Sequence, residues 1–213
     1  MKHFSLSDIQ AWDRFYRANF VNSLSGFKPV SLIASKSSKE DLNLAIFSNI
    51  VHIGADPAMI GFINRPREAA PHTIRNIEET GIYTINHIRG EFAEQAHQTS
   101  AKYPDGVNEF DAVGLNPEFK VDFGVPFVKE SHIQYAMELF EIIPLRMNNT
   151  FLVVGQLQHA FVEKGALKED GFLELSAAGS MVSLGLDAYY QTTPHSRFSY
   201  AKPDQSPRSI SNV

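Results

Sequence analysis

Side chains able to bind a ligand or to react are concentrated between Asn43 and Ile77. Small, polar and aromatic residues lie there next to short apolar runs that are typical of strands. The segments concerned are residues 43–49, 51–54, 61–66 and 72–77. A binding site is therefore expected in this part of the chain.

The spacing of the other reactive residues argues against several common catalytic sites. The eight histidines are scattered and form no His-Glu-x-x-His motif, so a metal site would need residues from distant segments, and none is predicted. Residues 179–183 have the first glycine of a nucleophile elbow but not the second, which gives a serine hydrolase little support. No P-loop or Gly-x-Gly-x-x-Gly turn occurs, so a nicotinamide cofactor would have to dock in another manner.

The composition is that of a single soluble globular domain over residues 1–213, with 43% hydrophobic and 20% charged residues. A net charge of -5 argues against nucleic acid as a partner. The chain has no cysteine, which excludes disulfides, thiolate nucleophiles and Cys-ligated metal sites. Residues 1–10 lack the pattern of a signal peptide, and no apolar run approaches the roughly 20 residues that a membrane helix needs. We expect a cytoplasmic protein without a membrane partner.

An amphipathic helix is predicted near the start of the chain. Ser7 precedes Gln10 at the spacing of a capping box, and apolar residues recur at helical spacing as far as Tyr16. This helix is expected to end near Gly26, because glycine readily adopts the positive φ of a helix stop. From Val30 onward the period changes to two, with Val30, Leu32 and Ala34 alternating with Ser31, Ile33 and Ser35, which indicates a strand.

The rest of the chain predicts mainly β structure with short helices. A long hairpin is expected to pair residues 133–143 with residues 150–162, and short helices are expected over 72–80 and 91–102. Closing many short strands into a barrel removes vulnerable sheet edges, so the expected fold class is mainly β, a small β-barrel with peripheral helices. The polar tail, residues 202–213, is predicted to be loosely ordered.

Ordered sequence blocks resemble those of a known family. They are NLAIFSNIVHIG at 43–54, GFINRP at 61–66, HTIRNI at 72–77, TINHI at 84–88, AHQTSAKY at 96–103 and EFDAVGL at 109–115. In these blocks the chain resembles the flavin reductase-like, FMN-binding split-barrel family, in the branch that contains flavoredoxin-type proteins. The likeness runs from about Arg17 to Tyr200. The loop at 37–41 departs from the family, whose members often have a glycine-containing turn there, so no cofactor contact is assigned to it.

The resemblance implies an FMN-binding split β-barrel that forms a homodimer, with FMN at the subunit interface and NADH or NADPH as the electron donor. It implies that main-chain groups near Phe47 bind the polar edge of the flavin ring, chiefly those of Ala45, Phe47 and Ser48. It also implies that the flavin phosphate binds at the start of the helix near His72, with Arg65 preferred to Arg75 for the charged contact. The cofactor-binding residues expected are Asn43, Ala45, Ile46, Phe47, Ser48, Asn49, Arg65, His72, Thr73 and Asn76. No catalytic side chain is expected, because a flavin carries the redox chemistry itself.

Several of these residues also have an ordinary structural interpretation. Asn43 and Asn49 suit turns at strand ends, and Thr73 suits a helix cap. The aromatic residues of 185–190 and 197–203 either wall the flavin pocket or bury the end of the chain against a partner subunit.

Three functions remain open from the sequence. The first is an NAD(P)H-dependent flavin reductase that passes electrons to free flavin, to a partner oxygenase or to another acceptor. The second is an FMN-containing electron carrier that another protein reduces. The third is a barrel that binds a ligand other than flavin. NADH and NADPH are not distinguished, because the residues that would read the nicotinamide's ribose cannot be located without the usual dinucleotide fold.

Overall fold

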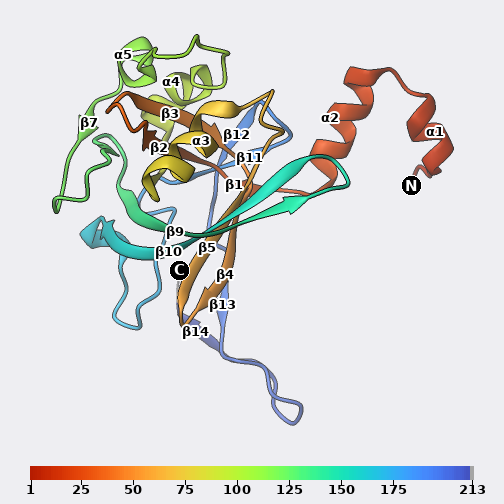
Figure 1. Cartoon of the computed structure of the whole chain (residues 1–213). Helices are drawn as coiled ribbons and strands as arrows, with labels where there is room; N and C mark the ends of the chain where they lie inside the picture. The colour runs from red at the N-terminus through yellow and green to blue at the C-terminus, as the bar shows by residue number, and fades with distance from the viewer. Residues whose placement is uncertain (212–213) are drawn as a thin grey trace.

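The computed structural model describes residues 1–211, which form a curled antiparallel β-sheet with helices around it (Figure 1). The main sheet has seven strands in the order β3-β2-β6-β9-β10-β5-β4, and each strand runs antiparallel to its neighbours. These strands are β2 (Ser31–Lys36), β3 (Leu42–Phe47), β4 (Ile50–Ala55), β5 (Ala58–Asn64), β6 (Ile82–His87), β9 (Ile133–Leu145) and β10 (Thr150–Val162). Mainly β structure with peripheral helices is therefore confirmed. Within residues 1–211, β3 and β4 remain the outer strands of the sheet.

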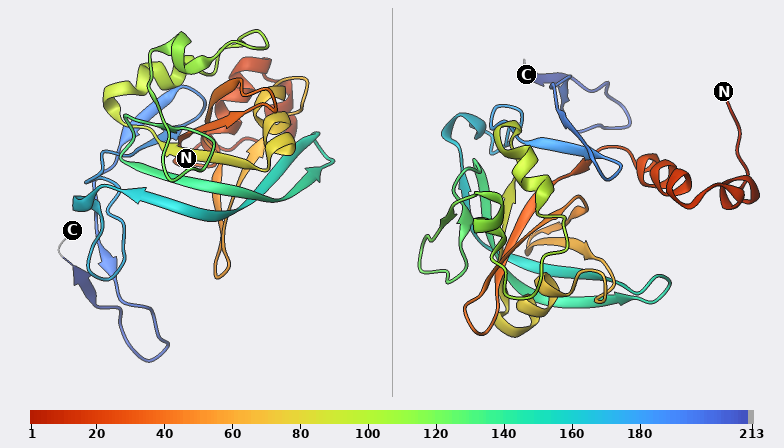
Figure 2. Two further views of the ribbon diagram at one scale, coloured as in Figure 1. Left: turned by 60° about the vertical axis from the view of Figure 1, so that its left-hand side comes forward. Right: turned by 90° about the horizontal axis from the view of Figure 1, so that it is seen from above.

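Smaller sheets and short helices surround the main sheet (Figure 2). The small sheets are built from β1 (Lys28–Pro29), β11 (Met181–Leu184) and β12 (Ala188–Gln191); from β7 (Pro117–Glu118) and β8 (Phe127–Val128); and from β13 (Arg197–Phe198) and β14 (Ser209–Ser211). The helices are α1 (Leu6–Ala11), α2 (Arg14–Leu24), α3 (Pro71–Thr80), α4 (Ala93–Gln98) and α5 (Glu109–Val113), with single turns η1 (Gly90–Phe92) and η2 (Lys164–Ala166). No helix in the described part of the chain is long and apolar enough to cross a membrane.

Strand β2 lies at the centre of the core, which has apolar clusters on both faces of this strand. Ile33 packs into one cluster with the α3 residues Ile74 and Ile77. Leu32 and Ala34 pack into the other, which also contains side chains of α4 and α5. The alternation expected from Val30 is therefore not an alternation of buried and exposed residues: every residue from 31 to 35 is buried, because both faces of the strand are covered.

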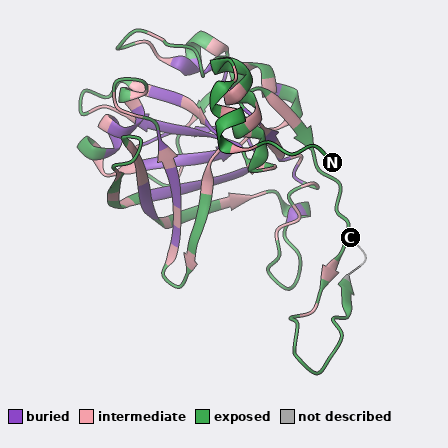
Figure 3. Ribbon diagram, turned by 90° about the vertical axis from the view of Figure 1, so that its right-hand side faces the viewer, coloured by how far each residue is buried: buried purple, intermediate pink, exposed green. Residues whose placement is uncertain are grey.

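The helix expected at the start of the chain is two helices. The capping box joins Ser5 to Asp8, not Ser7 to Gln10, and it begins α1. The chain is extended at Trp12, which ends α1. Asp13 then caps the start of α2, because its side chain accepts hydrogen bonds from two main-chain N–H groups. The end near Gly26 is confirmed, since Gly26 has a φ of 76°. Neither helix contains a buried residue (Figure 3).

The predicted helix over 72–80 is confirmed as α3, which has proline at its first position and Gly81 in the left-handed conformation as its stop. The helix expected over 91–102 is wrong in extent, because the chain forms η1 and then only the short helix α4. Helix α5 was not foreseen, since five residues are too few for a periodic pattern.

The long hairpin is confirmed as β9 and β10, with register shifts at Val154/Gly155 and Leu157/His159. Strand β14 of the tail pairs with β13, which lies just before the tail, and residues 202–210 are exposed. Part of the predicted loose tail, residues 212–213, lies outside the described residues.

Gly155 of β10 leaves space in the core for the hydroxyl end of the Tyr83 side chain. Tyr83 is fully buried against Phe62, with ring centroids 5.7 Å apart. Its hydroxyl has no hydrogen-bond partner within residues 1–211. A Cβ at position 155 would lie 2.3 Å from that hydroxyl oxygen.

We predict that Gly155→Ala lowers the free energy of unfolding by about 1–3 kcal/mol, the usual cost of overpacking a core. Adding Tyr83→Phe should recover part of the loss, because it removes the atom in closest contact and an unpaired buried hydroxyl. Urea unfolding of the two single variants and the double variant measures both effects. Equal losses in Gly155→Ala with and without Tyr83→Phe would contradict this account of the contact.

Candidate functional site

A cleft of about 380 Å³ opens beside β3. Its walls come from β3 and the turn after it, from the segment leading into α3, from residues after α4, and from the β11–β12 hairpin. All but one of the expected cofactor-binding residues line it: Asn43, Ala45, Ile46, Phe47, Ser48, Asn49, Arg65, His72 and Thr73. Asn76 instead lines a neighbouring cavity of about 310 Å³, which shares Asn43 and His72 with the cleft.

The free edge of β3 presents main-chain groups on the side away from β2. Leu44 N–H donates to Glu109 Oε2 at 3.0 Å instead of to β2, so Leu44 occupies a non-hydrogen-bonded position of the β2–β3 ladder. Because these positions alternate, the N–H and C=O of Ile46 also point outward, whereas those of Ala45 and Phe47 point toward β2. The register therefore favours Ile46 over Ala45 and Phe47 for main-chain contacts to a ligand.

A buried polar network supports the wall of the cleft at α3. Asn43 Nδ2 donates to Thr73 Oγ1 at 3.1 Å and to Ser35 Oγ at 3.3 Å, and Asn76 Nδ2 donates to the same serine at 3.3 Å. All four side chains are buried. Since the Thr73 oxygen accepts from Asn43, its hydroxyl hydrogen is available to an acceptor in the cleft. Asn76 supports this arrangement from behind the cleft wall.

Asn43, Asn49 and Thr73 have different structural roles. Asn43 is inside β3 and is not a strand-end turn residue. Asn49 does have the turn role, because its side-chain amide donates to Ile63 O at 2.9 Å and accepts from Ile63 N at 3.2 Å, which ties the turn to β5. Thr73 is not the helix cap: that position is Ala70, whose side chain offers no capping hydrogen bond.

The N-terminus of α3 is suited to binding an anion. The first N–H groups of a helix have no partner inside it, and those of His72 and Thr73 lie at the cleft. The helix dipole adds positive potential there. The Thr73 hydroxyl provides a further donor at the same place.

The arginines near this helix differ in their partners. Arg67 pairs with Glu78, and Arg75 Nη2 lies 2.7 Å from Asp105 Oδ1. The hydrogen bond from Arg75 holds the pKa of Asp105 below its usual value. Arg65 lines the cleft and forms no ion pair within residues 1–211, so it is the arginine that remains available to an anion.

The wall opposite β3 contains His97, to which sequence reasoning assigned no role, and Tyr189, one of the aromatic residues of 185–190. His97 Nδ1 lies 2.7 Å from the hydroxyl oxygen of Tyr189, which joins α4 to β12 across the cleft. Leu186 also lines the cleft, so residues 185–190 do contribute to its wall. Arg197, in contrast, pairs with Asp170 and does not line the cleft. The only available signal was the resemblance of residues 96–103 and 185–190 to family blocks, because the contact joins segments far apart in sequence.

The lining of the cleft fits an elongated ligand that carries an anionic group and a polar ring edge. Donors and positive charge gather at α3, and the free peptide groups of Ile46 lie further along β3. Ser183 Oγ is buried, lines the cleft and has no hydrogen-bond partner in the described part of the chain. A flavin mononucleotide has a phosphate and a ring edge with both donors and acceptors, so the residues present fit it.

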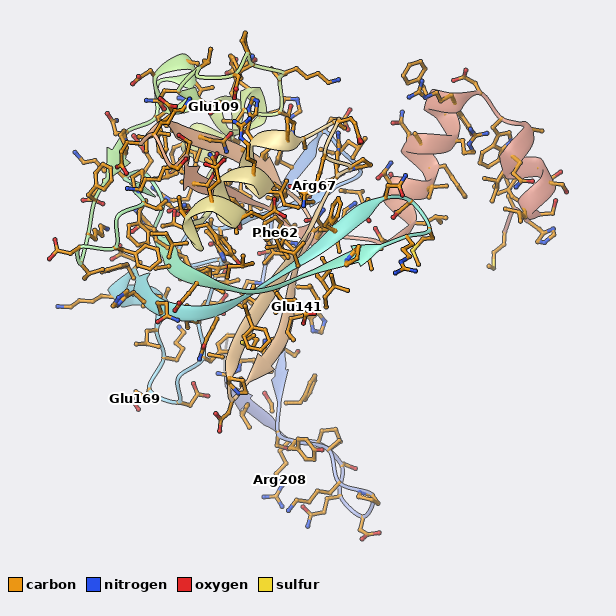
Figure 4. The ribbon with its side chains drawn as sticks, in the orientation of Figure 1. Phe62, Arg67, Glu109, Glu141, Glu169 and Arg208 are labelled. Carbon is orange, nitrogen blue, oxygen red and sulfur yellow. The ribbon has the colours of Figure 1, made fainter. Side chains whose placement is uncertain are left out.

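Glu109 is a buried carboxyl group in the wall of the cleft (Figure 4). Burial raises the pKa of Glu109, while the hydrogen bond from Leu44 N–H and the charge of His72 act in the opposite direction. Within residues 1–211, no group of three His, Asp or Glu side chains is placed to hold a metal ion. The role that the geometry gives Glu109 is to occupy the Leu44 N–H of the β3 edge.

We predict a pH-dependent stability difference between the unmodified protein and Glu109→Gln, which keeps an acceptor for Leu44 N–H but cannot ionise. Because its folded-state pKa is raised, Glu109 contributes stability that is complete below its ordinary pKa of 4.5 and is lost as the pH rises through the folded-state pKa. As the pH rises from acid to neutral, the free energy of unfolding of the Gln variant should therefore increase relative to that of the unmodified protein. Glu94→Gln, on the exposed face of α4, is the control. A difference for Glu109→Gln that does not vary with pH would contradict the assignment.

Residues 27–184 match the model of the flavin reductase like domain. The structure is similar to a Shewanella frigidimarina protein with a split barrel domain that is assigned as a flavin reductase, with 43% identity, a TM-score of 0.91 and coverage of 94% of this chain and 100% of that chain. The chain spans 61% and 57% of the lengths of two curated relatives that it matches.

Two more distant structures share the fold. Nitrilotriacetate monooxygenase component B from Bacillus cereus is 20% identical, with a TM-score of 0.79 over 92% of this chain and 97% of that one. Flavoredoxin from Desulfovibrio vulgaris is 18% identical, with a TM-score of 0.70 over 85% of this chain and 93% of that one. The match to the flavin reductase like domain covers most of the chain, so the chain belongs to the flavin reductase-like family. It has the split-barrel fold that the resemblance of its sequence blocks implied.

Proposed function

We propose that this protein is an NAD(P)H-dependent flavin reductase that binds FMN in the cleft beside β3. The observation that carries the proposal is a single cleft that joins an anion-binding helix end to the free edge of a strand. When bound, the flavin supplies the redox chemistry by accepting a hydride equivalent from a reduced nicotinamide and passing electrons on. No side chain has to act as a general acid or base, and we assign no catalytic residue.

The residues of the cleft then have distinct binding roles. The N–H groups of α3, the Thr73 hydroxyl and Arg65 bind the phosphate. The peptide groups of Ile46 bind the polar edge of the ring, and the neighbouring residues of β3 contact it through their side chains. Tyr189 contributes to the opposite wall and limits access of water.

We further propose a cytoplasmic homodimer with FMN at the subunit interface. A cleft that opens at a sheet edge can be closed by a second copy, and exclusion of water protects a reduced flavin. The electron acceptor is proposed to be free flavin, a partner oxygenase or another protein. Structural similarity to a monooxygenase component supports an oxygenase as one such partner.

A second candidate is an FMN-containing electron carrier that another protein reduces. Structural similarity to flavoredoxin favours this alternative. The two functions differ in one measurable property, namely whether the protein itself oxidises NADH or NADPH.

We predict that the purified protein binds FMN and that anaerobic addition of NADH or NADPH bleaches the visible absorption of the oxidised flavin. Parallel additions of each nicotinamide identify the donor. Bound FMN that neither nicotinamide reduces would overturn the reductase and favour the electron carrier. A colourless protein that takes up no FMN in excess would overturn both and leave a barrel for another ligand.

We predict that Thr73→Val and Arg65→Ala each weaken FMN binding by roughly 1–3 kcal/mol, the cost of losing one charge-assisted hydrogen bond, where 1.4 kcal/mol is tenfold in Kd. Riboflavin lacks the phosphate, so its Kd should change little in the same variants. Arg75→Ala is the matched control, because Arg75 is paired with Asp105 and does not line the cleft. Equal losses for FMN and riboflavin would show that the phosphate binds elsewhere.

A further inference from the structure

The first two helices form an arm that stands away from the β-sheet. We define the N-terminal arm as residues 4–24; it extends from the body in Figure 1 and in the right-hand view of Figure 2. No residue of α1 or α2 is buried. The arm nevertheless has a defined shape, because Ser5 and Asp13 cap its helices and Arg17 Nη1 donates to Gln10 O at 2.9 Å.

The arm has more aromatic surface than its own contacts cover. Edge-to-face contacts join Trp12 to the rings of Phe4, Tyr16 and Phe20, with centroids about 5 Å apart. Further large apolar side chains stay exposed, among them Phe15, which is 73% exposed. The other large apolar side chains of the arm that are exposed are Phe4, Leu6, Tyr16, Val21 and Leu24. An apolar surface of this kind on a well-shaped element usually marks an interaction site.

The root of the arm lies at the rim of the cleft. Phe27 packs edge-to-face on Tyr190, with centroids 4.9 Å apart, and the neighbouring Tyr189 lines the cleft. Lys28 Nζ donates to Asn22 O at 2.9 Å, which fixes the end of α2 to the chain that enters the sheet. The arm therefore leaves the body in a set direction, and the eleven residues of α2 carry α1 about 16 Å away from the root.

The β9–β10 ribbon has an exposed face of matching character. A bulge opposite Val154/Gly155 leaves Phe140 unpaired in the ladder, with 67% of its surface exposed. Glu138 and Glu141 lie on either side of this ring along the strand and are exposed, as is Ile143 further on (Figure 4 labels Glu141). This face presents aromatic and acidic groups together.

The charges that could meet between the arm and the ribbon are complementary locally. The arm as a whole contains two basic and two acidic side chains, whereas Glu138 and Glu141 place two negative charges beside Phe140 on the ribbon. Arg14 lies next to Phe15 on the exposed part of α2. An Arg–Phe pair on the arm thus matches the Glu–Phe–Glu group of β9 in both charge and apolar character.

We propose that the N-terminal arm docks on the exposed face of the β9–β10 ribbon of a second copy, so that two chains exchange arms. A second copy is the occupant because each chain has both surfaces, and a two-fold arrangement then satisfies both arms at once. The β9–β10 ribbon of the same chain is not the docking site. The contacts at the root of the arm hold the arm apart from that ribbon, as the right-hand view of Figure 2 shows. This inference rests on the homodimer of the proposed function and adds the surfaces that hold it together.

Cross-linking between copies tests the arrangement, since a chain without cysteine allows single cysteines to be placed freely. One copy receives Ala11→Cys in the arm and a size tag, and the other receives Gln156→Cys, which pairs across the ladder with Glu138. Mixing the two with a short bis-maleimide should give a tagged–untagged covalent pair. The control replaces Gln156→Cys with Glu169→Cys, in an exposed loop at a different part of the body (Figure 4), and should give several-fold less product.

Charge reversal provides a second readout. Arg14→Glu and Glu141→Arg should each raise the dissociation constant of the dimer measured by sedimentation, and the combined variants should restore part of the loss. Both side chains are exposed and lie outside the cleft, so the fold of each chain should remain.

The outcomes separate this proposal from the flavin proposal. A chain that binds FMN but gives no more product with Gln156→Cys than with Glu169→Cys overturns the arm exchange alone. A monomer at all concentrations overturns it as well, and so does a dimer that neither charge reversal weakens. A chain that cross-links as expected without binding FMN supports the arm exchange and overturns the proposed function.

Discussion

The free edge of β3 is the constraint on which the rest of the site depends. An outer strand leaves alternate N–H and C=O groups without partners, and buried peptide groups must be paired. Here Glu109 from α5 accepts the N–H of Leu44, and the peptide groups of Ile46 remain at the cleft. In the described part of this split barrel β3 is an outer strand, and the cleft lies beside its free edge.

Helix α3 provides the other half of the site through the same sheet. Its apolar residues pack on β2, and the network from Ser35 through Asn43 to Thr73 fixes its first turn against β3. A polar network this deeply buried is stable only when its members are mutually hydrogen-bonded. Strand edge and helix end are thus held in a fixed relation, which allows one rigid ligand to contact both.

Much of this arrangement could be predicted from local sequence, and the rest could not. The β9–β10 hairpin and α3 have clear patterns and stop signals, and the residues that line the cleft gather in one stretch of the chain. Burial on both faces of β2 removed the expected alternation. Glu109 and the His97–Tyr189 contact join segments that are distant in sequence, so no local pattern indicates them.

The most direct test of the central claim is a crystal structure of the protein with FMN. The account predicts the phosphate within hydrogen-bond distance of Thr73 Oγ1 and the first N–H groups of α3, and the edge of the flavin ring against the peptide groups of Ile46. A flavin whose phosphate lies away from α3, or whose ring leaves the edge of β3 free, would contradict it.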